Sequence, residues 1–230
     1  MTVCNVGDSR IVLGSVVEET NGKSSEKDTA EEEKTEVGEE LSSPSKPTGP
    51  VVATPLSVDQ TPFRKDERER VKAAGAEVKT IDMVEGRAEY HDDWGDFTLG
   101  EHIDERGDPP RVWIKGKAHP GTAFTRSLGD QLGEDIGICA EPEMETRHIT
   151  KNDKYLVIAS DGVFEFLPNQ VVINLCESAA NPLQACEIIT EAAYEKWLHY
   201  ERRTDDITVI VCFLDSNYDP KEDTKEQSER

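Results

Sequence analysis

The sequence YLVIASDG, at residues 155–162, joins a run of five apolar residues to a short polar segment. Such a run, bounded by turn residues, is typical of a buried β-strand. Asp161 and Gly162 directly follow the predicted strand, which ends at Ser160, so a carboxylate is expected where a rigid strand meets solvent. That position suits a hard cation such as Mg²⁺ or Mn²⁺. With equal weight, Asp161 and Gly162 fit the two-residue turn of a β-hairpin.

Further aspartates stand beside other structural signals. Asp205 and Asp206 come directly before the continuous apolar run of residues 207–214, which we interpret as a core strand, although they also fit an ordinary polar loop. Asp130 closes the sequence TRSLGD at residues 125–130, where a Gly-Asp pair alone predicts only a turn. Three separate aspartates do not identify a metal site.

The C-terminal half also contains two predicted helices, at residues 169–178 and 182–198. Pro182 suits the first turn of the second helix, and apolar residues at helical spacing form one face of it: Cys186, Ile189, Ala193 and Trp197. A third helix is expected at residues 64–74, on the surface, with Val71 and Ala74 as its apolar face and Gly75 as its end. The spacing is too irregular for βαβ repeats, so the pattern favours an antiparallel α+β fold or a layered sandwich.

At the N-terminus, residues 2–17 predict a β-hairpin that turns at Gly7-Asp8-Ser9. A strand at the very first residues would be left as an unprotected edge. We therefore expect the chain to be the C-terminal part of a longer domain. Between this hairpin and the first helix, an extended segment is expected around residues 55–62, and residues 82–110 predict a long loop.

The chain is strongly acidic, with 26 Lys and Arg against 48 Asp and Glu and a net charge of −22. This balance argues against binding of nucleic acid or of anionic lipid by bulk electrostatics. Much of the charge lies in residues 17–50 and 216–230, which have few apolar residues and which we predict to be disordered. No apolar run approaches a membrane span, and five widely spaced cysteines favour buried thiols in a reducing, intracellular setting.

As a whole, the sequence resembles the metal-dependent protein serine/threonine phosphatases of the PPM or protein phosphatase 2C type. Six pieces occur in the family's order: NVGDSR (5–10), LSVDQTP (56–62), TRSLGD (125–130), EPE (141–143), IASDGVFE (158–165) and TDDITVI (204–210). Each piece alone is a weak signal, but six in order are specific. The resemblance is closest to plant and protist members in which such a domain can be joined to cyclic-nucleotide-binding and kinase domains.

The resemblance implies a β-sandwich flanked by helices, α+β in class, with two Mg²⁺ or Mn²⁺ ions at one end and a third, weaker ion beside them. A metal-bound water would attack the phosphorus of phosphoserine or phosphothreonine in a protein substrate. By the family pattern, Asp161 and Asp205 would bind the catalytic metals, and Asp130 would help Asp161 to hold the third. Gly162 would be structural. Asp206 replaces the family's usual asparagine, so its role as a ligand stays open.

The sequence also departs from the family pattern. The 230 residues contain no Asp-Gly-His-Gly-Gly motif, which in the family supplies a bridging carboxylate and a candidate general acid, and they lack the upstream phosphate-binding arginine. The chain is therefore expected to be a partial phosphatase domain of residues 1–16 and 51–215, weak or inactive on its own and cytoplasmic or nuclear. The alternative is a non-catalytic module that binds a phosphoprotein or regulates a kinase. Plain turn aspartates in a structural domain are the least favoured interpretation.

Overall fold

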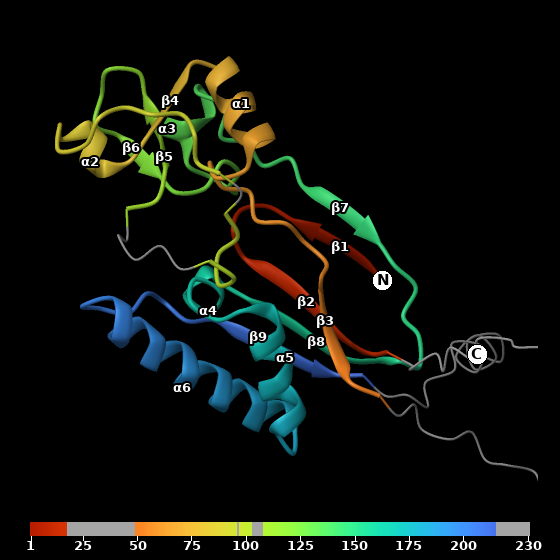
Figure 1. Ribbon diagram of the computed structural model, residues 1–230. Helices are drawn as coiled ribbons and strands as arrows, with labels where there is room; N and C mark the ends of the chain where they lie inside the picture. The colour runs from red at the N-terminus through yellow and green to blue at the C-terminus, as the bar shows by residue number, and fades with distance from the viewer. Residues whose placement is uncertain (18–48, 96, 103–107, 215–230) are drawn as a thin grey trace, which may run out of the picture.

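The centre of the molecule is a four-stranded antiparallel sheet with the strand order β3-β2-β8-β9. It is seen in a computed structural model that describes residues 1–17, 49–95, 97–102 and 108–214 (Figure 1). The strands are β2 (Arg10–Val16), β3 (Val51–Pro55), β8 (Asp153–Ala159) and β9 (Val209–Phe213). The strand expected at residues 155–159 is thus confirmed as part of β8, one of the two inner strands.

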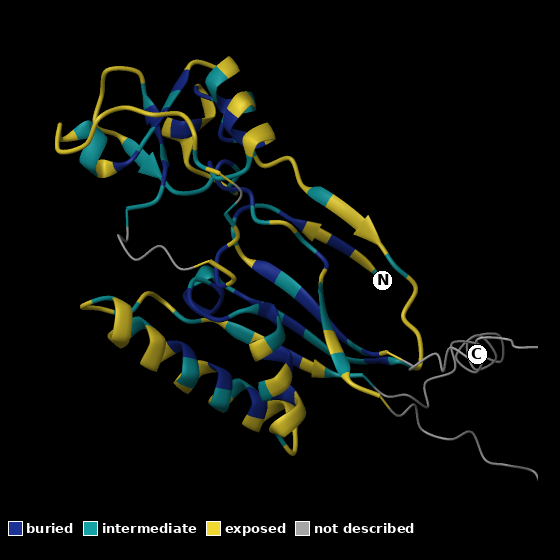
Figure 2. Ribbon diagram, viewed as in Figure 1, coloured by how far each residue is buried: buried dark blue, intermediate teal, exposed yellow. Residues whose placement is uncertain are grey.

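Two helices cover one face of this sheet, α5 (Asn169–Ser178) and α6 (Pro182–Tyr200), as Figure 1 shows. The core between the helices and the sheet is apolar, and the side chains of Val12, Val157, Ile173 and Ile189 are fully buried. Figure 2 shows the buried stripe of α6 turned toward the sheet and its exposed residues turned away from it. Burial of this apolar area is the main source of stability for both layers.

The start of α6 follows from its sequence. The Asn181 side chain accepts a hydrogen bond of 3.0 Å from the Gln184 backbone N–H, and Pro182 occupies the first turn. Ala185, Ile189 and Ala193 recur every four residues and are all buried. Both helices predicted in this half of the chain are confirmed, α5 with the predicted bounds and α6 with two further residues at its end.

A second, two-stranded sheet lies on the other face of the central sheet. It pairs β1 (Thr2–Asn5) with β7 (Glu143–Thr146) in antiparallel register. Val3 of β1 packs against Leu13 of β2 and against Leu56, and all three side chains are buried. The two sheets and the covering helices form the expected α+β sandwich.

The predicted N-terminal hairpin is wrong. β1 pairs with β7, whereas β2 pairs with β3 and β8, so the two strands belong to different sheets. Gly7, with φ of +102°, turns the chain from one sheet to the other. The Gln60 side chain holds this corner, because its Oε1 accepts from the Gly7 N–H at 2.7 Å and its own backbone N–H donates to the Gly7 carbonyl at 3.0 Å.

A third sheet, β4-β5-β6, forms the lobe at the upper left of Figure 1 together with α1. Val71 of α1, Val78 of β4 and Val112 of β5 form its core, each at most 1% exposed. Gly75 ends the helix with φ of +101°, as expected. The elements of this lobe are α1 (Lys65–Ala73), β4 (Ala76–Lys79), α2 (Ile81–Val84), β5 (Arg111–Ile114), β6 (Pro120–Thr122) and α3 (Gln131–Glu134).

The helix α1 is less superficial than predicted. Ala74 is exposed, so its place on the apolar face is wrong, and the charged residues Glu67 and Arg68 are 1% and 8% exposed. Glu67 is buried because Arg70 and Arg126 pair with it at 2.8 and 2.7 Å. A buried charge with two partners cannot be recognised from helical periodicity, which treats every Glu as a surface residue.

Two expectations about apolar runs also need correction. Within the run at residues 207–214, only residues 209–213 form β9, at the edge of the central sheet, where Val211 is buried but Ile210 is 53% exposed. Only alternate residues of an edge strand with one covered face reach the core. For the same reason Cys212 and Cys4 are exposed, and of the five thiols only Cys176 is buried.

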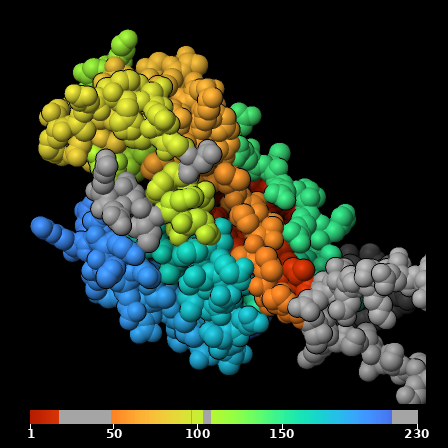
Figure 3. All heavy atoms as spheres, viewed as in Figure 1, coloured from red at the N-terminus to blue at the C-terminus, as the bar shows by residue number. Residues whose placement is uncertain are grey.

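Other expectations fall on segments that are only partly described. The predicted loop at residues 82–110 begins within α2, and in its described part after that helix only an isolated bridge between Leu99 and His102 is regular. Residues 97–102 lie between the upper lobe and the helical layer (Figure 3). The segments predicted to be disordered fall almost entirely outside the described residues, at 18–48 and 215–230. None of the described helices is long and apolar enough to cross a membrane.

Candidate metal centre

Asp161 stands where β8 ends and the short helix α4 (Asp161–Phe164) begins. Ser160 is the N-cap residue, and the Gly162 N–H donates to the Asp161 carboxylate at 2.8 Å. The alternative of a hairpin turn at these positions is therefore wrong, because the chain continues into a helix. Asp161 is thus fixed at the end of an inner strand.

Asp205 lies at the same end of the sheet, in the segment that leads into β9. The antiparallel pairing of β8 with β9 sets Ala159 opposite Val209, so the end of one strand lies beside the start of the other. Ser160 connects the two segments. Its N–H donates to the Thr208 carbonyl at 3.0 Å, and its hydroxyl donates to the Asp206 carbonyl at 3.2 Å.

Gly162 allows the loop before β9 to approach α4 closely. A Cβ atom at this position would lie 2.3 Å from the Asp206 carbonyl oxygen, closer than side-chain carbons come to backbone atoms. The Gly162 carbonyl also accepts a hydrogen bond of 2.7 Å from the Trp197 indole N–H. These contacts support the structural role that the family resemblance implies for Gly162.

Asp8 is the site residue that the sequence analysis missed. It follows Gly7 at the corner between β1 and β2 and lines the same cavity as Asp161 and Asp205, of about 560 Å³. The sequence treats Gly7-Asp8-Ser9 as a tight turn, and no local pattern shows that Asp8 meets residues more than 150 positions away. Its place within NVGDSR, one of the six family-like pieces, was the available signal.

The electrostatics of these carboxylates fit a cation site. Burial, followed by the charge of Asp161, raises the pKa of Asp8 to about 6. Burial and the charge of Asp205 likewise raise the pKa of Asp161, although the Gly162 N–H opposes the shift. Asp8 and Asp161 are half-buried and Asp205 is exposed. Partly buried carboxylates that repel one another favour protonation, and divalent cations relieve the same repulsion. The three residues therefore fit an oxygen-ligated hard cation.

The remaining lining residues complete the cavity. No histidine or cysteine is among its described lining residues, so the donors there are oxygen atoms, which favour Mg²⁺ or Mn²⁺ over zinc. Two arginines, Arg111 and Arg203, contribute positive charge. The other lining residues are Pro109, Gly121, Thr122, Ala123, Phe124, Glu165, Phe166, Trp197, Glu201 and Thr204.

Asp130 and Asp206 do not line this cavity. Asp130 is exposed, adopts φ of +56° before α3, and accepts a hydrogen bond from the Ser127 hydroxyl. Asp206 contributes its backbone, since its N–H donates to the Asp205 carboxylate at 2.8 Å. The structure thus brings Asp161 and Asp205 together, and metal binding by Asp130 or Asp206 stays a prediction.

A second group of carboxylates is occupied by arginines. Asp66, Glu67 and Glu143 have carboxylate oxygens within 4.8 Å of one another. However, Arg64 pairs with Asp66 at 2.6 Å and with Glu143 at 2.8 Å. Burial raises the pKa of Glu67, but hydrogen bonds from Arg126, Arg70 and Thr125 outweigh it and bring that pKa to about 2. This cluster is a structural ion-pair network.

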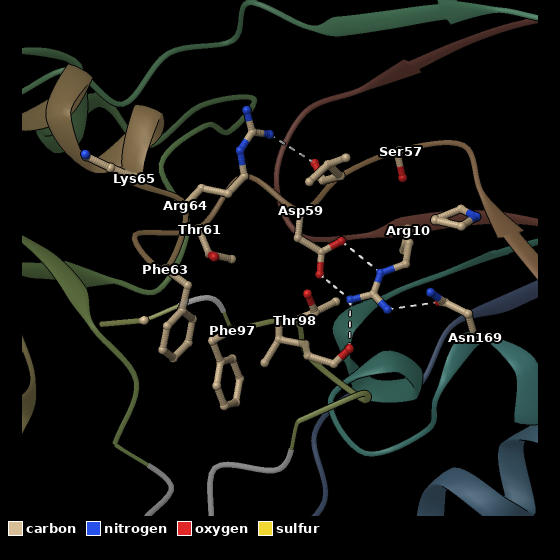
Figure 4. A pocket seen from close by; sticks show the side chains of 14 residues that line it. Arg10, Ser57, Asp59, Thr61, Phe63, Arg64, Lys65, Phe97, Thr98 and Asn169 are labelled. Carbon is tan, nitrogen blue, oxygen red and sulfur yellow. Dashed lines mark hydrogen bonds and ion pairs between the residues drawn. The ribbon is translucent and has the colours of Figure 1, made fainter. Parts of the chain in front are cut away.

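A second cavity, of about 390 Å³, is lined by Arg10 and Asp59 (Figure 4). There the Arg10 guanidinium donates to both Asp59 oxygens, at 3.0 and 2.6 Å, and to the Asn169 side chain at 3.0 Å. The stacked rings of Phe63 and Phe97, with centroids 4.3 Å apart, form one wall. The charge of Asp59 also raises the pKa of Asp8 and of Asp161. The ion pair anchors the start of β2, two residues after Asp8.

We expect Asp8→Asn to stabilise the chain when EDTA removes divalent cations. The folded state holds a proton on Asp8 up to about pH 6, whereas the unfolded state loses it near pH 4, so stability falls as pH rises between these values. Asparagine removes that penalty and is expected to add about 1–2 kcal/mol at pH 7.5, with a smaller gain at pH 5. Urea unfolding at the two pH values measures the difference. A variant less stable than the parent at pH 7.5 would contradict it.

Comparison with known proteins places these features in context. The family model "Protein phosphatase 2C" matches residues 1–198. "Probable protein phosphatase 2C 35" of Arabidopsis thaliana is 48% identical over 161 residues, which cover 70% of this chain and 45% of that protein. "Probable protein phosphatase 2C 72" of the same plant is 30% identical over 224 residues, or 96% of this chain and 52% of that protein.

Solved structures share the fold. The serine-threonine phosphatase 2C structure from Toxoplasma gondii superposes with a TM-score of 0.58 at 15% identity, covering 93% of this chain and 54% of that one. At this identity the likeness shows the fold alone. The chain spans about half the length of these relatives.

Proposed function

The chain belongs to the protein phosphatase 2C family, and from this premise we propose that it acts in the metal-dependent hydrolysis of phosphoserine and phosphothreonine in proteins. The observation that carries the proposal is the convergence of Asp8, Asp161 and Asp205 on one cavity. They come from three separate segments of the chain. Only the folded sandwich brings them together.

The proposed role of these residues is to hold Mg²⁺ or Mn²⁺. Asp161 and Asp205 would bind the catalytic ions, and the half-buried carboxylate of Asp8 would add a third oxygen donor at the same cavity. When bound, such ions supply an activated water molecule and screen the charge of the phosphate. Ser160 and Gly162 keep the two segments that carry Asp161 and Asp205 in register. Asp130, which lies outside the lining, remains a proposed ligand of a weaker third ion.

Membership of the family indicates the class of substrate and the type of reaction, but not the individual partners. Proteins of this family act on phosphorylated proteins, and we propose the same substrate class here. We further propose that turnover by these 230 residues alone is low, because the sequence contains no Asp-Gly-His-Gly-Gly motif. The link to kinase or cyclic-nucleotide-binding domains and the cytoplasmic or nuclear location stay predictions.

Phosphate release from a phosphothreonine peptide tests the proposed function. We expect slow release that requires Mn²⁺ or Mg²⁺, falls to background in EDTA, and returns when the ion is restored. The same samples are titrated with the peptide by calorimetry. Metal-independent peptide binding without any phosphate release would contradict the proposal and favour the alternative of a non-catalytic binding module.

A further inference from the structure

Arg203 occupies an unusual place among the arginines of the chain. It lies in the loop between α6 and β9, two residues before Asp205, and lines the metal-site cavity. Within the described residues its guanidinium makes no hydrogen bond and no ion pair. Arg10, Arg64 and Arg126, in contrast, each pair with a carboxylate at 2.8 Å or less.

The unpaired guanidinium of Arg203 lies at a cavity whose described lining is rich in negative charge. The described lining of the cavity contains five carboxylates and two cationic side chains, Arg203 and Arg111. Arg111 is anchored to the wall by a hydrogen bond of 3.1 Å to the Gly121 carbonyl, and its Nε is buried without a partner. Both guanidinium groups therefore keep donors that no described protein acceptor uses.

This inference rests on the proposed function. We propose that Arg203, assisted by Arg111, binds the non-bridging oxygens of the substrate's phosphoryl group. A phosphate ester that enters a cavity lined by carboxylates is repelled unless positive charge meets it. Bound divalent cations would supply that charge on the side of Asp8, Asp161 and Asp205, and the arginines would supply it on the remaining side. A guanidinium suits this task because its planar fork donates two parallel hydrogen bonds to phosphate oxygens.

The neighbouring residue provides a matched control. Arg202 is also exposed and carries the same charge, but it does not line the cavity. Replacing either arginine changes the net charge of the chain equally. Because neither side chain makes a hydrogen bond or an ion pair within the described residues, neither replacement should disturb the fold. A difference between the two variants therefore reports the position of the guanidinium at the cavity.

The test measures binding, so that it does not depend on turnover. A peptide carrying a non-hydrolysable phosphonate analogue of phosphothreonine is titrated by calorimetry in the presence of Mn²⁺, with the unmodified threonine peptide as a blank. We expect Arg203→Ala to weaken binding of the phosphonate peptide by about tenfold or more, which is the scale of a lost charge-assisted hydrogen bond. Arg203→Lys should recover part of the loss, and Arg202→Ala should stay within about twofold of the parent chain.

Two further results separate the inference from the proposed function. Mn²⁺ titration of Arg203→Ala should give an affinity no lower than that of the parent chain, because the arginine is not a metal ligand. If the parent chain binds the phosphonate peptide and Arg203→Ala binds it equally well, or Arg202→Ala loses as much, the role of Arg203 is wrong while the phosphatase proposal stands. If the parent chain shows no Mn²⁺-dependent binding of this peptide, both are overturned.

Discussion

Replacement of Asp161 by asparagine is expected to lower the affinity of the chain for Mn²⁺ at least 100-fold and to remove any Mn²⁺-dependent phosphate release. Asp161 sits at the end of β8 and shares its cavity with Asp8 and Asp205. An amide of the same shape keeps the fold but removes one negative charge and one carboxylate ligand. Calorimetric titration with Mn²⁺ measures the affinity directly.

The same variant has a second signature that misfolding cannot imitate. In EDTA, Asp161→Asn should be at least as stable as the parent chain, because the cost of burying a charge and the repulsion from Asp205, which together raise the pKa of Asp161, are gone. With Mn²⁺ added, the parent chain should gain stability as the ion binds only the folded state, about 2.7 kcal/mol at a concentration 100 times the Kd, whereas the variant should gain almost none.

A matched substitution completes this experiment. Asp135 is exposed, lies outside the cavity, and makes no described side-chain hydrogen bond, so Asp135→Asn should keep the full response to Mn²⁺. A normal response in Asp161→Asn would contradict the proposed metal centre. Loss of the response in both variants would mean that the effect comes from net charge.

Breaking the buried ion pair between Arg10 and Asp59 is expected to have the largest effect on stability. The two side chains are 3% and 10% exposed, and Nη2 of Arg10 lies 2.6 Å from the Asp59 carboxylate. Asp59→Ala would leave the guanidinium buried without its counter-ion, although Asn169 and the Leu99 carbonyl still accept from it. Such losses cost about 3–5 kcal/mol, measured as the free energy of unfolding in urea.

A more exposed pair serves as the reference for this substitution. Glu77 and Lys79 lie 2.7 Å apart with about 30% of each side chain exposed, and Glu77→Ala should cost less than about 1 kcal/mol. The structure shows the Arg10–Asp59 pair shielded from solvent. If Asp59→Ala costs no more than Glu77→Ala, that shielding is contradicted. Asp59→Asn should fall between the two, because its amide oxygen still accepts one hydrogen bond from Arg10.

Local patterns predicted several elements correctly, and the reason is visible in each case. Residues 169–178 and the helix opened by Pro182 combine helical periodicity with start signals that act within one turn. The strand at residues 155–159 is a continuous apolar run in the middle of the sheet. For the site, Asp161 and Asp205 could be chosen because they lie beside apolar runs that are recognisable as strands, although β9 itself begins at Val209.

Other features could not be predicted because they depend on partners distant in sequence. The turn at Gly7 resembles a hairpin locally, yet its strands pair with β7, β3 and β8, and the side chain that holds it is Gln60. The buried Glu67 requires Arg126, fifty-nine residues away. Asp8 gains its raised pKa only from burial and from carboxylates brought to it by the fold.

Residue order and chemistry were thus sufficient to establish the α+β class, the C-terminal helices, the family resemblance and two carboxylates at strand ends. They act through neighbours along the chain, where spacing and capping can be seen directly. Which aspartates face one cavity, which arginines remain unpaired there, and which sheet receives each N-terminal strand depend on contacts across long sequence separations. Those contacts form only when the apolar faces of the two layers are buried together, and it is the resulting sandwich that sets Asp8 and Arg203 beside Asp161 and Asp205.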